Sequence, residues 1–179
     1  MQHKKIPNEN LGRISESEFK KADKTPVIVV LDNIRSFNNV GSVFRSSDAF
    51  RIEAIYLCGI TPRPPHRDIQ KTALGATETV DWQYFEKTSD ALDQLEKNEF
   101  ETWAIEQTEN SISLENFDFS RQKKRALVFG NEVEGVAQSI IDRCAGCIEI
   151  PQIGSKHSLN IAVSSGIVLW ECFKSLRPE

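Results

Sequence analysis

Residues 126–138 read ALVFGNEVEGVAQ, and this stretch combines the parts of a ligand-binding turn. An apolar run that reads as a strand ends at Gly130, a short polar turn follows, and Gly135 opens what reads as a helix. A strand, a glycine turn and a helix N-terminus commonly hold a phosphate group through backbone N–H groups. This turn, however, carries the carboxylates of Glu132 and Glu134, which have the same sign of charge as a phosphate.

The two carboxylates make a phosphate site in this turn unfavourable. At an effective dielectric constant of about 20, a unit charge about 4 Å from one carboxylate is repelled by about 4 kcal/mol. Backbone N–H groups hardly offset two such terms unless both side chains point away. The turn therefore favours a cationic or hydroxyl-rich ligand, such as a sulfonium or a ribose. For Glu134 the simplest alternative is a charge that suits the positive end of a helix dipole.

Strand candidates alternate with helix candidates along the chain. The strand candidates span residues 27–31, 54–59, 80–85, 101–105, 125–129 and 148–150. The helix candidates span residues 16–22, 40–50, 67–74, 89–98, 136–144 and 158–175. Because the strands are uniformly apolar, this alternation predicts an α/β fold with a largely parallel sheet and helices on both faces. We expect a polar N-terminal extension over residues 1–25 and one domain over residues 26–179.

Three polar turns follow strand candidates, where parallel sheets collect ligands. They span residues 32–41, 130–135 and 151–158. In the first, Asn39 can cap a helix and Gly41 lets another backbone approach closely, although a capped helix with a solvated Arg45 explains this turn just as simply. In the third, we expect Ser158 to cap the last helix. Asn160 then falls in the first helical turn, where a poor helix former indicates a polar role.

The composition is that of a soluble globular protein. The chain has 179 residues, of which 39% are hydrophobic and 27% are charged. No apolar run approaches the roughly 18 residues of a membrane span, and the N-terminal MQHKKIPNEN has no signal-peptide core. We therefore expect a cytoplasmic protein. A net charge of -4 argues against non-specific coating of nucleic acid, but it leaves room for a local basic face.

Cys144 and Cys147 form a CxxC pair for which a metal or redox role is disfavoured. Zinc would need two further nearby ligands, and no second pair or histidine spacing provides them. The pair also follows a helix candidate, whose negative end opposes thiolate formation. We expect structural thiols and no metal site.

The order and spacing of the three turns point to one family. The segments NNVGSVFRSSDAF, LVFGNEVEGV and IEIPQIGSKHSLNIAVSSGIVLWE closely resemble the three signature motifs of the SpoU (TrmH-type) RNA ribose 2′-O-methyltransferases, in the SPOUT class. The resemblance covers residues 27–175. It implies an α/β knot with a C-terminal trefoil knot, S-adenosylmethionine as cofactor, RNA as partner, and a homodimer whose active site lies near the subunit interface.

The resemblance also assigns roles to residues of this chain. The residues that match the catalytic and substrate-positioning positions of the family are Asn39, Arg45, Glu132 and Asn160. Those that match the cofactor-contact positions are Leu127, Gly130, Ile150, Ser158 and Leu159. The family usually has Met where this chain has Gln152, a change that we expect to be tolerated.

The RNA-binding surface is inferred from charge and not from the motifs. Its candidate residues are Arg63, His66, Arg67 and Lys71, in and after the proline-rich TPRPPHRD loop, together with the N-terminal lysines. In a dimer this surface would be present twice.

The motifs and the charge pattern leave three candidate functions. The first is S-adenosylmethionine-dependent methylation of a ribose 2′-hydroxyl in structured RNA, with tRNA favoured over rRNA because the chain lacks room for a separate N-terminal RNA-binding domain. The alternative is a catalytically inactive protein of the same fold that binds RNA or S-adenosylmethionine. An unrelated nucleotide-binding module is disfavoured by the acidic turn.

Overall fold

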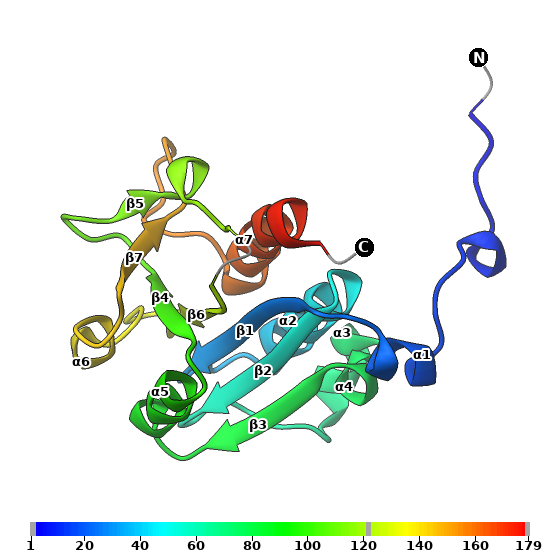
Figure 1. Cartoon of the computed structure of the whole chain (residues 1–179), viewed down its shortest axis with the longest axis horizontal. Helices are drawn as coiled ribbons and strands as arrows, with labels where there is room; N and C mark the ends of the chain where they lie inside the picture. The colour runs from blue at the N-terminus through cyan, green and yellow to red at the C-terminus, as the bar shows by residue number, and fades with distance from the viewer. Residues whose placement is uncertain (1–2, 121–122, 178–179) are drawn as a thin grey trace.

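A seven-stranded parallel sheet forms the centre of the computed structural model, which describes residues 3–120 and 123–177 (Figure 1). The strands are β1 (Thr25–Asp32), β2 (Ile52–Cys58), β3 (Asp81–Phe85), β4 (Glu101–Ile105), β5 (Ile112–Ser113), β6 (Arg125–Phe129) and β7 (Gly146–Glu149). They lie in the order β3-β2-β1-β6-β4-β7-β5, and neighbouring strands pair in parallel. The parallel α/β sheet predicted from the sequence is therefore confirmed.

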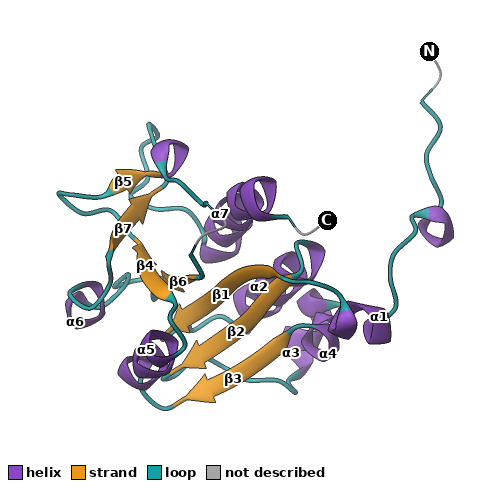
Figure 2. Cartoon of the chain, in the orientation of Figure 1, coloured by secondary structure: helices purple, strands orange, loops and turns teal. Residues whose placement is uncertain are grey.

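Helices cover both faces of the sheet (Figure 2). They are α1 (Glu16–Lys21), α2 (Phe37–Ala49), α3 (Arg67–Ala73), α4 (Ala76–Thr79), α5 (Thr88–Lys97), α6 (Gln138–Ile141) and α7 (Ile161–Leu176), with short 3-10 turns at Asn8–Asn10 and Leu114–Asn116. Successive side chains of a strand point to opposite faces. Val27, Val29 and Leu31 of β1 accordingly pack with α2, α3 and α7, whereas Ile28 and Val30 pack with α5 and α6.

The N-terminal extension is attached to the body through α1. Ser15 and Glu18 form a capping box, in which the Glu18 N–H donates to Ser15 Oγ over 3.3 Å and the Ser15 N–H donates to Glu18 Oε2 over 2.7 Å. Phe19, on the same helix, is only 4% exposed and joins the core. The helix expected at 16–22 is therefore present, while residues 3–14 extend away from the body (Figure 1).

Two helix starts differ from the sequence-based prediction. Asn160, and not Ser158, caps the last helix, since its side-chain oxygen accepts from the Ala162 N–H over 2.9 Å and the helix begins at Ile161. The helix expected to open at Ser89 begins at Thr88 without a side-chain cap.

The turn after β6 also differs from its prediction. The Asn131 N–H donates to the Gly135 carbonyl over 3.0 Å, and the Gly135 N–H donates back to the Asn131 carbonyl over 2.9 Å. This paired turn delays the helix, so α6 spans only Gln138–Ile141 and not 136–144. Glu134 therefore lies in the turn, and its interpretation as a helix-start charge is wrong.

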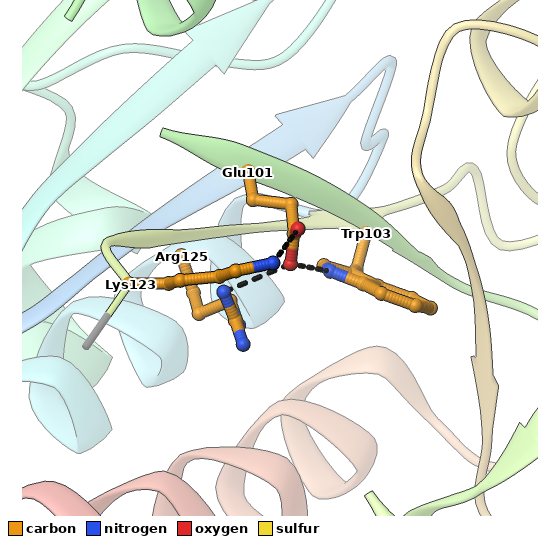
Figure 3. A network of polar contacts seen from close by, with 4 residues as sticks. All are labelled: Glu101, Trp103, Lys123 and Arg125. Atoms are coloured by element: carbon orange, nitrogen blue, oxygen red, sulfur yellow. Dashed lines mark hydrogen bonds and ion pairs between the residues drawn. The ribbon is translucent and has the colours of Figure 1, made fainter. Parts of the chain in front are cut away.

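A charged cluster lies at the end of the sheet where β4 and β6 begin, opposite the end that carries the turn after β6 (Figure 3). Glu101 lies beside Arg125 in the register of these strands, and its Oε2 lies 2.8 Å from Arg125 Nη1 in an ion pair without hydrogen-bond alignment. The Trp103 indole N–H donates to Glu101 Oε2 over 2.9 Å, and Lys123 Nζ donates to Oε1 over 2.7 Å. Burial raises the pKa of Glu101, but these donors and the Arg125 charge outweigh it and lower the pKa.

Replacing Glu101 should destabilise the fold, because Arg125 is only 5% exposed and would lose its carboxylate partner. Exposed ion pairs contribute about 0–1 kcal/mol, whereas removing one partner of a buried pair costs about 3–5 kcal/mol. For this half-buried pair we expect Glu101→Gln to lower the free energy of unfolding by about 2 kcal/mol in urea denaturation. The matched control is Lys123→Gln, whose exposed side chain should cost less than about 1 kcal/mol. Equal losses in the two variants would contradict this assignment.

Candidate functional site

The turns that follow β1 and β6 are joined by the carboxylate of Glu132. Its Oε2 accepts a hydrogen bond from the Arg35 N–H over 2.9 Å, and its Oε1 accepts one from the Ser36 N–H over 3.1 Å. Because β1 and β6 are neighbours in the sheet, their carboxyl ends bring these turns side by side. Glu132 thus fixes the position of the residues that start α2.

A chain of side-chain hydrogen bonds continues from Glu132 to α7. Asn39 Nδ2 donates to Glu132 Oε1 over 3.1 Å, and Asn160 Nδ2 donates to Asn39 Oδ1 over 3.2 Å. Asn160 uses its own side-chain oxygen to cap α7. Three of the four residues expected to act in catalysis therefore lie in one network, which joins segments separated by about a hundred residues along the sequence.

Arg45, the fourth expected catalytic residue, stands outside this network. It is exposed on α2, six residues beyond Asn39. It makes no hydrogen bond or ion pair with any of the residues that the structure describes. The guanidinium of Arg45 is therefore exposed and not engaged by the described residues.

Gly41 on α2 explains how this helix approaches its neighbour. A Cβ atom at this position would collide with the Ile69 carbonyl and the Thr72 side chain of α3. The Thr72 hydroxyl donates to the Asn38 carbonyl over 3.0 Å across the same contact. The close backbone approach expected at Gly41 is confirmed, and it positions α3 beside the start of α2.

The hydrogen bonds at Glu132 determine the direction of its pKa shift. Partial burial raises the pKa of the carboxyl group. The N–H groups of Arg35 and Ser36 and the Asn39 amide act in the opposite direction and prevail, so the pKa lies below its ordinary value. The group is therefore a carboxylate at neutral pH that serves as an acceptor, not as a proton donor.

Two residues that the sequence analysis did not single out shape the turn after β6. Asn131 Nδ2 donates to the Asn33 carbonyl over 2.7 Å, and Asn131 Oδ1 accepts from the Val133 N–H over 2.9 Å. Glu106 follows β4 directly, and its Oε2 accepts from the Val136 N–H over 3.1 Å. In the sequence, Glu106 could have been recognised as a candidate site residue because it is a polar residue directly after an apolar strand.

A cavity of about 320 Å³ opens beside the network at the carboxyl ends of β4, β6 and β7. Its walls combine apolar side chains with acids and amides from three turns. The lining residues are Ile105, Glu106, Gln107, Phe129, Gly130, Glu132, Gly135, Ile148, Glu149, Ile150, Gln152, Ser158, Leu159, Asn160, Ile161 and Ser164. Three of these side chains are carboxylates and none is basic, so the cavity is negatively charged.

Four of the five residues expected to contact a cofactor lie at this cavity. They are Gly130, Ile150, Ser158 and Leu159. Leu127 does not line it, because its side chain is 0% exposed and lies in the core, paired in register with Val29 of β1 and Trp103 of β4. The side chain of Leu127 therefore belongs to the core, and contact of Leu127 with a cofactor stays a prediction.

The two glycines of the turn after β6 are required by packing. A Cβ atom on Gly130 would overlap the backbone of Gly135 and Val136. Gly135 has a φ of +69°, which favours glycine, and a Cβ there would overlap the Glu106 carboxylate. These glycines allow the turn to pack against its own backbone and against the Glu106 carboxylate. Glycines in a phosphate-binding turn have a different role, since they allow the backbone to approach the phosphate.

The residues expected to bind RNA form an exposed group on the loop before α3 and on α3 itself. Arg63 lies 4.1 Å above the centroid of the Tyr84 ring. His66 caps α3 by accepting from the Asp68 N–H at Nδ1 over 3.2 Å. Arg67 and Lys71 follow on α3. The structure places all four on the surface, with α3 packed against α2 and His66 against Phe37 at the start of α2.

Thiols and metal ligands give no second site. Burial raises the pKa of Cys144 to about 12, which suppresses the thiolate that redox chemistry needs. Within residues 3–120 and 123–177, no cluster of three or more His, Cys, Asp or Glu side chains is arranged to hold a metal ion. In the same described ranges, no helix is both long and apolar enough to cross a membrane.

Comparison with known proteins identifies relatives of this chain. The model of the SpoU rRNA methylase family matches residues 26–170. The 23S rRNA (guanosine-2′-O-)-methyltransferase RlmB of Neisseria meningitidis serogroup B is 29% identical over 156 residues, which are 87% of this chain and 61% of that enzyme. The chain thus spans less than two thirds of the length of the first curated relatives it matches.

Solved structures of low sequence identity share the fold. An AdoMet-bound rRNA methyltransferase from Sinorhizobium meliloti superposes with a TM-score of 0.80 at 24% identity, covering 89% of this chain and 61% of that one. The TrmH/SpoU tRNA modifying enzyme of A. aeolicus superposes with a TM-score of 0.77 at 24% identity, covering 89% of this chain and 79% of that one. The parallel sheet and its helices are therefore an arrangement that these enzymes share.

The carboxyl group of Glu132 should titrate below the ordinary Glu value of about 4.3. Because the pKa of the folded state is depressed, Glu132 adds stability above about pH 4.3, and this contribution is lost as the pH falls through the folded-state pKa. Asn39→Ala removes one donor and should raise the midpoint, measured by NMR titration of the side-chain carboxyl carbon. Glu134→Gln, in the same turn, should leave it unchanged. A wild-type midpoint at or above the ordinary value would contradict the network.

Proposed function

The chain belongs to the SpoU rRNA methylase family, and we propose that it is an RNA methyltransferase that transfers the methyl group of S-adenosylmethionine to a ribose 2′-hydroxyl. The observation that carries this proposal is the Glu132–Asn39–Asn160 network, which opens onto an acid-lined cavity. Our proposal assigns residues 26–179 to the methyltransferase domain and residues 1–25 to an extension of it. It places the reaction in the cytoplasm.

The cavity suits S-adenosylmethionine in size and in charge. Its volume of about 320 Å³ lies at the lower end of the range of roughly 300–1,000 Å³ for small-molecule sites. Apolar walls suit an adenine ring, and the carboxylates of Glu106, Glu132 and Glu149 suit ribose hydroxyls and a sulfonium. When bound, this cofactor supplies an electrophilic methyl group. A nucleotide with phosphate groups would meet the repulsion of these acids.

The network residues hold the ribose and do not exchange protons with it. Asn39 uses one of its two amide hydrogens for Glu132, so the other can donate to a ribose oxygen. The Asn160 side chain holds the Asn39 amide in place by donating from Nδ2 to Asn39 Oδ1. Holding two reactants in line contributes about 7–11 kcal/mol to catalysis in favourable cases. In this proposal Asn39 and Asn160 supply that positioning and Glu132 holds Asn39 in place.

Arg45 supplies positive charge where the 2′-oxygen becomes an alkoxide, or holds the adjacent phosphate. Guanidinium groups stay protonated below about pH 12, so Arg45 stabilises charge and does not remove the proton, which passes to solvent water. Its exposure and its freedom from contacts with the described residues support a role toward RNA.

The apolar face of α7 supports a homodimer with the site near its interface. Val163, Ile167 and Trp170 of α7 lie at helical spacing and are 51%, 37% and 47% exposed, and Leu159, two residues before the helix, is 37% exposed. Such a stripe next to the cavity is suited to pairing with a second copy of the chain. Our proposal includes the trefoil knot of this fold class, formed by residues 130–135 and 151–160.

The substrate in this proposal is structured RNA. We predict that this RNA is a tRNA and not an rRNA. Ribose-methylation mapping of total tRNA and rRNA from cells with and without the gene should reveal one lost methylation. Calorimetry should show S-adenosylmethionine binding to the purified protein. Asn39→Ala should keep this binding and lose about 10²-fold or more in methyl transfer, as when a preorganised donor is removed. Binding without transfer in the wild-type protein would favour the catalytically inactive alternative.

The role of Arg45 can be tested through the pH dependence of the rate. Arg45→Ala should lower the rate without changing cofactor affinity, and Arg45→Lys should restore part of it with an unchanged pH profile, because both cations stabilise charge. If Arg45→Lys restored full activity with a new pKa near the ordinary Lys value of about 10.4, Arg45 would be the base.

The dimer can be tested by sedimentation of wild type and Val163→Glu. Val163 is 51% exposed and lies in the first turn of α7, where a negative charge suits the helix dipole, so this variant should fold. We expect the wild type to sediment at twice the chain mass of 20.3 kDa and the variant at the chain mass. A wild-type monomer at micromolar concentration would refute the dimer.

A further inference from the structure

We propose that Phe37, His66, Arg63 and Tyr84 form a stacking surface for unpaired nucleobases beside the methylated ribose. This inference rests on the proposed function and narrows its substrate class to RNA that is single-stranded or looped out at the modified nucleotide. The four side chains are termed the stacking surface below.

The stacking surface consists of one pair of rings, Phe37 with His66, and one pair of a guanidinium with a ring, Arg63 with Tyr84. The rings of Phe37 and His66 have centroids 4.0 Å apart at an interplanar angle of 35°. The Arg63 guanidinium lies 4.1 Å above the Tyr84 ring. All four side chains are exposed, with Phe37 at 37% and Tyr84 at 36%. Aromatic rings and guanidinium planes are the groups on which unpaired RNA bases stack.

The loop that carries Arg63 and His66 is held firmly against the turn after β1. The Ile60 N–H donates to Asn33 Oδ1 over 3.2 Å, and the Ile34 N–H donates to Thr61 Oγ1 over 3.0 Å. Tyr84 contributes a third anchor, since its hydroxyl donates to the Gly59 carbonyl over 3.0 Å. The two pairs are therefore positioned before RNA arrives, which lowers the entropic cost of binding.

The stacking surface adjoins the network that orients the ribose. Phe37 is the first residue of α2 and Asn39 lies two residues further, within one helical turn of about 5.4 Å rise. The N–H of Ser36, directly before Phe37, is bound by Glu132. Residues two apart on a helix point to nearly opposite sides, so Asn39 faces Glu132 while Phe37 faces His66. A strand whose ribose contacts Asn39 therefore crosses the start of α2 and offers the base of a neighbouring nucleotide to the rings of Phe37 and His66.

Charge around the rings favours RNA over a protein partner. Arg67 and Lys71 of α3 are exposed next to His66, and Arg63 is itself part of the pair with Tyr84. Cations interleaved with aromatic rings suit a chain of phosphates and bases. Paired bases in a duplex are already stacked on one another and present their edges, so duplex RNA leaves the ring faces unused.

The test uses a short single-stranded RNA that contains the fluorescent base 2-aminopurine, and the same RNA annealed to its complement. We expect the wild-type protein to quench the fluorescence of the single strand and to bind it more tightly than the duplex. Phe37→Leu keeps an apolar side chain without a ring and should weaken single-strand binding about tenfold, within the range for loss of one stacked base. Phe37→Tyr keeps the ring and should bind as the wild type does.

The salt dependence separates stacking from charge. Phe37→Leu should leave the slope of log K against log salt unchanged, because no phosphate contact is lost. Lys71→Gln, the matched charge variant, should reduce this slope by about 0.7 per lost contact to a single strand. Tyr84→Leu and Tyr84→Phe repeat the ring test at the second pair, and thermal unfolding verifies that each variant is folded.

Two outcomes would overturn the stacking surface. They are equal binding of single strand and duplex, or wild-type affinity and quenching in both Phe37→Leu and Tyr84→Leu. Neither outcome concerns methyl transfer, which is measured separately by ribose-methylation mapping. If transfer is absent while ring-dependent quenching persists, the proposed function fails and the stacking surface stands.

Discussion

The hydrogen bonds of the Glu132 carboxylate are the interaction on which the site depends. They hold the N–H groups of Arg35 and Ser36, and through Asn39 they reach Asn160 at the start of α7. A parallel sheet brings the turns after β1, β6 and β7 to one edge, but it does not fix their side chains relative to one another. The Glu132 carboxylate, which accepts from three donors, does so, and these hydrogen bonds lower its pKa.

The same chemistry makes a phosphate group unfavourable in this strand–glycine–helix turn. N–H groups that a phosphate would otherwise use are bound by the protein's own acids: Glu132 binds those before α2, and Glu106 binds the Val136 N–H after the glycine turn. Both acids line the cavity, and carboxylates suit hydroxyl and cationic groups. A family defined by transfer of a methyl group to RNA is consistent with such a cavity.

Much of the fold could be predicted because it depends on local pattern. Apolar runs such as 125–129 matched strands, and the Ser15–Glu18 capping box matched a helix. The errors occur where distant groups compete with local preference. Ser158 is a good cap by residue type, but Asn160 takes that place. Glu134 suits a helix start by charge, but the pairing of Asn131 with Gly135 delays the helix to Gln138. Glu106 carried only a weak signal, since its partner is a backbone N–H 30 residues away.

The sequence by itself determined the class of fold, the three polar turns and the acidic character of the middle turn, because apolar periodicity and charge are properties of neighbouring residues. Only the tertiary structure decided what those residues do. It showed that Glu132 is an acceptor within a network, that Glu134 starts no helix, and that Arg45 makes no contact with that network. It also showed that the ring of Phe37, at the start of α2, lies against the ring of His66, before α3. The physical reason is that hydrogen bonds and ring contacts act over a few ångströms in space, and the residues they join lie up to 121 positions apart in the chain.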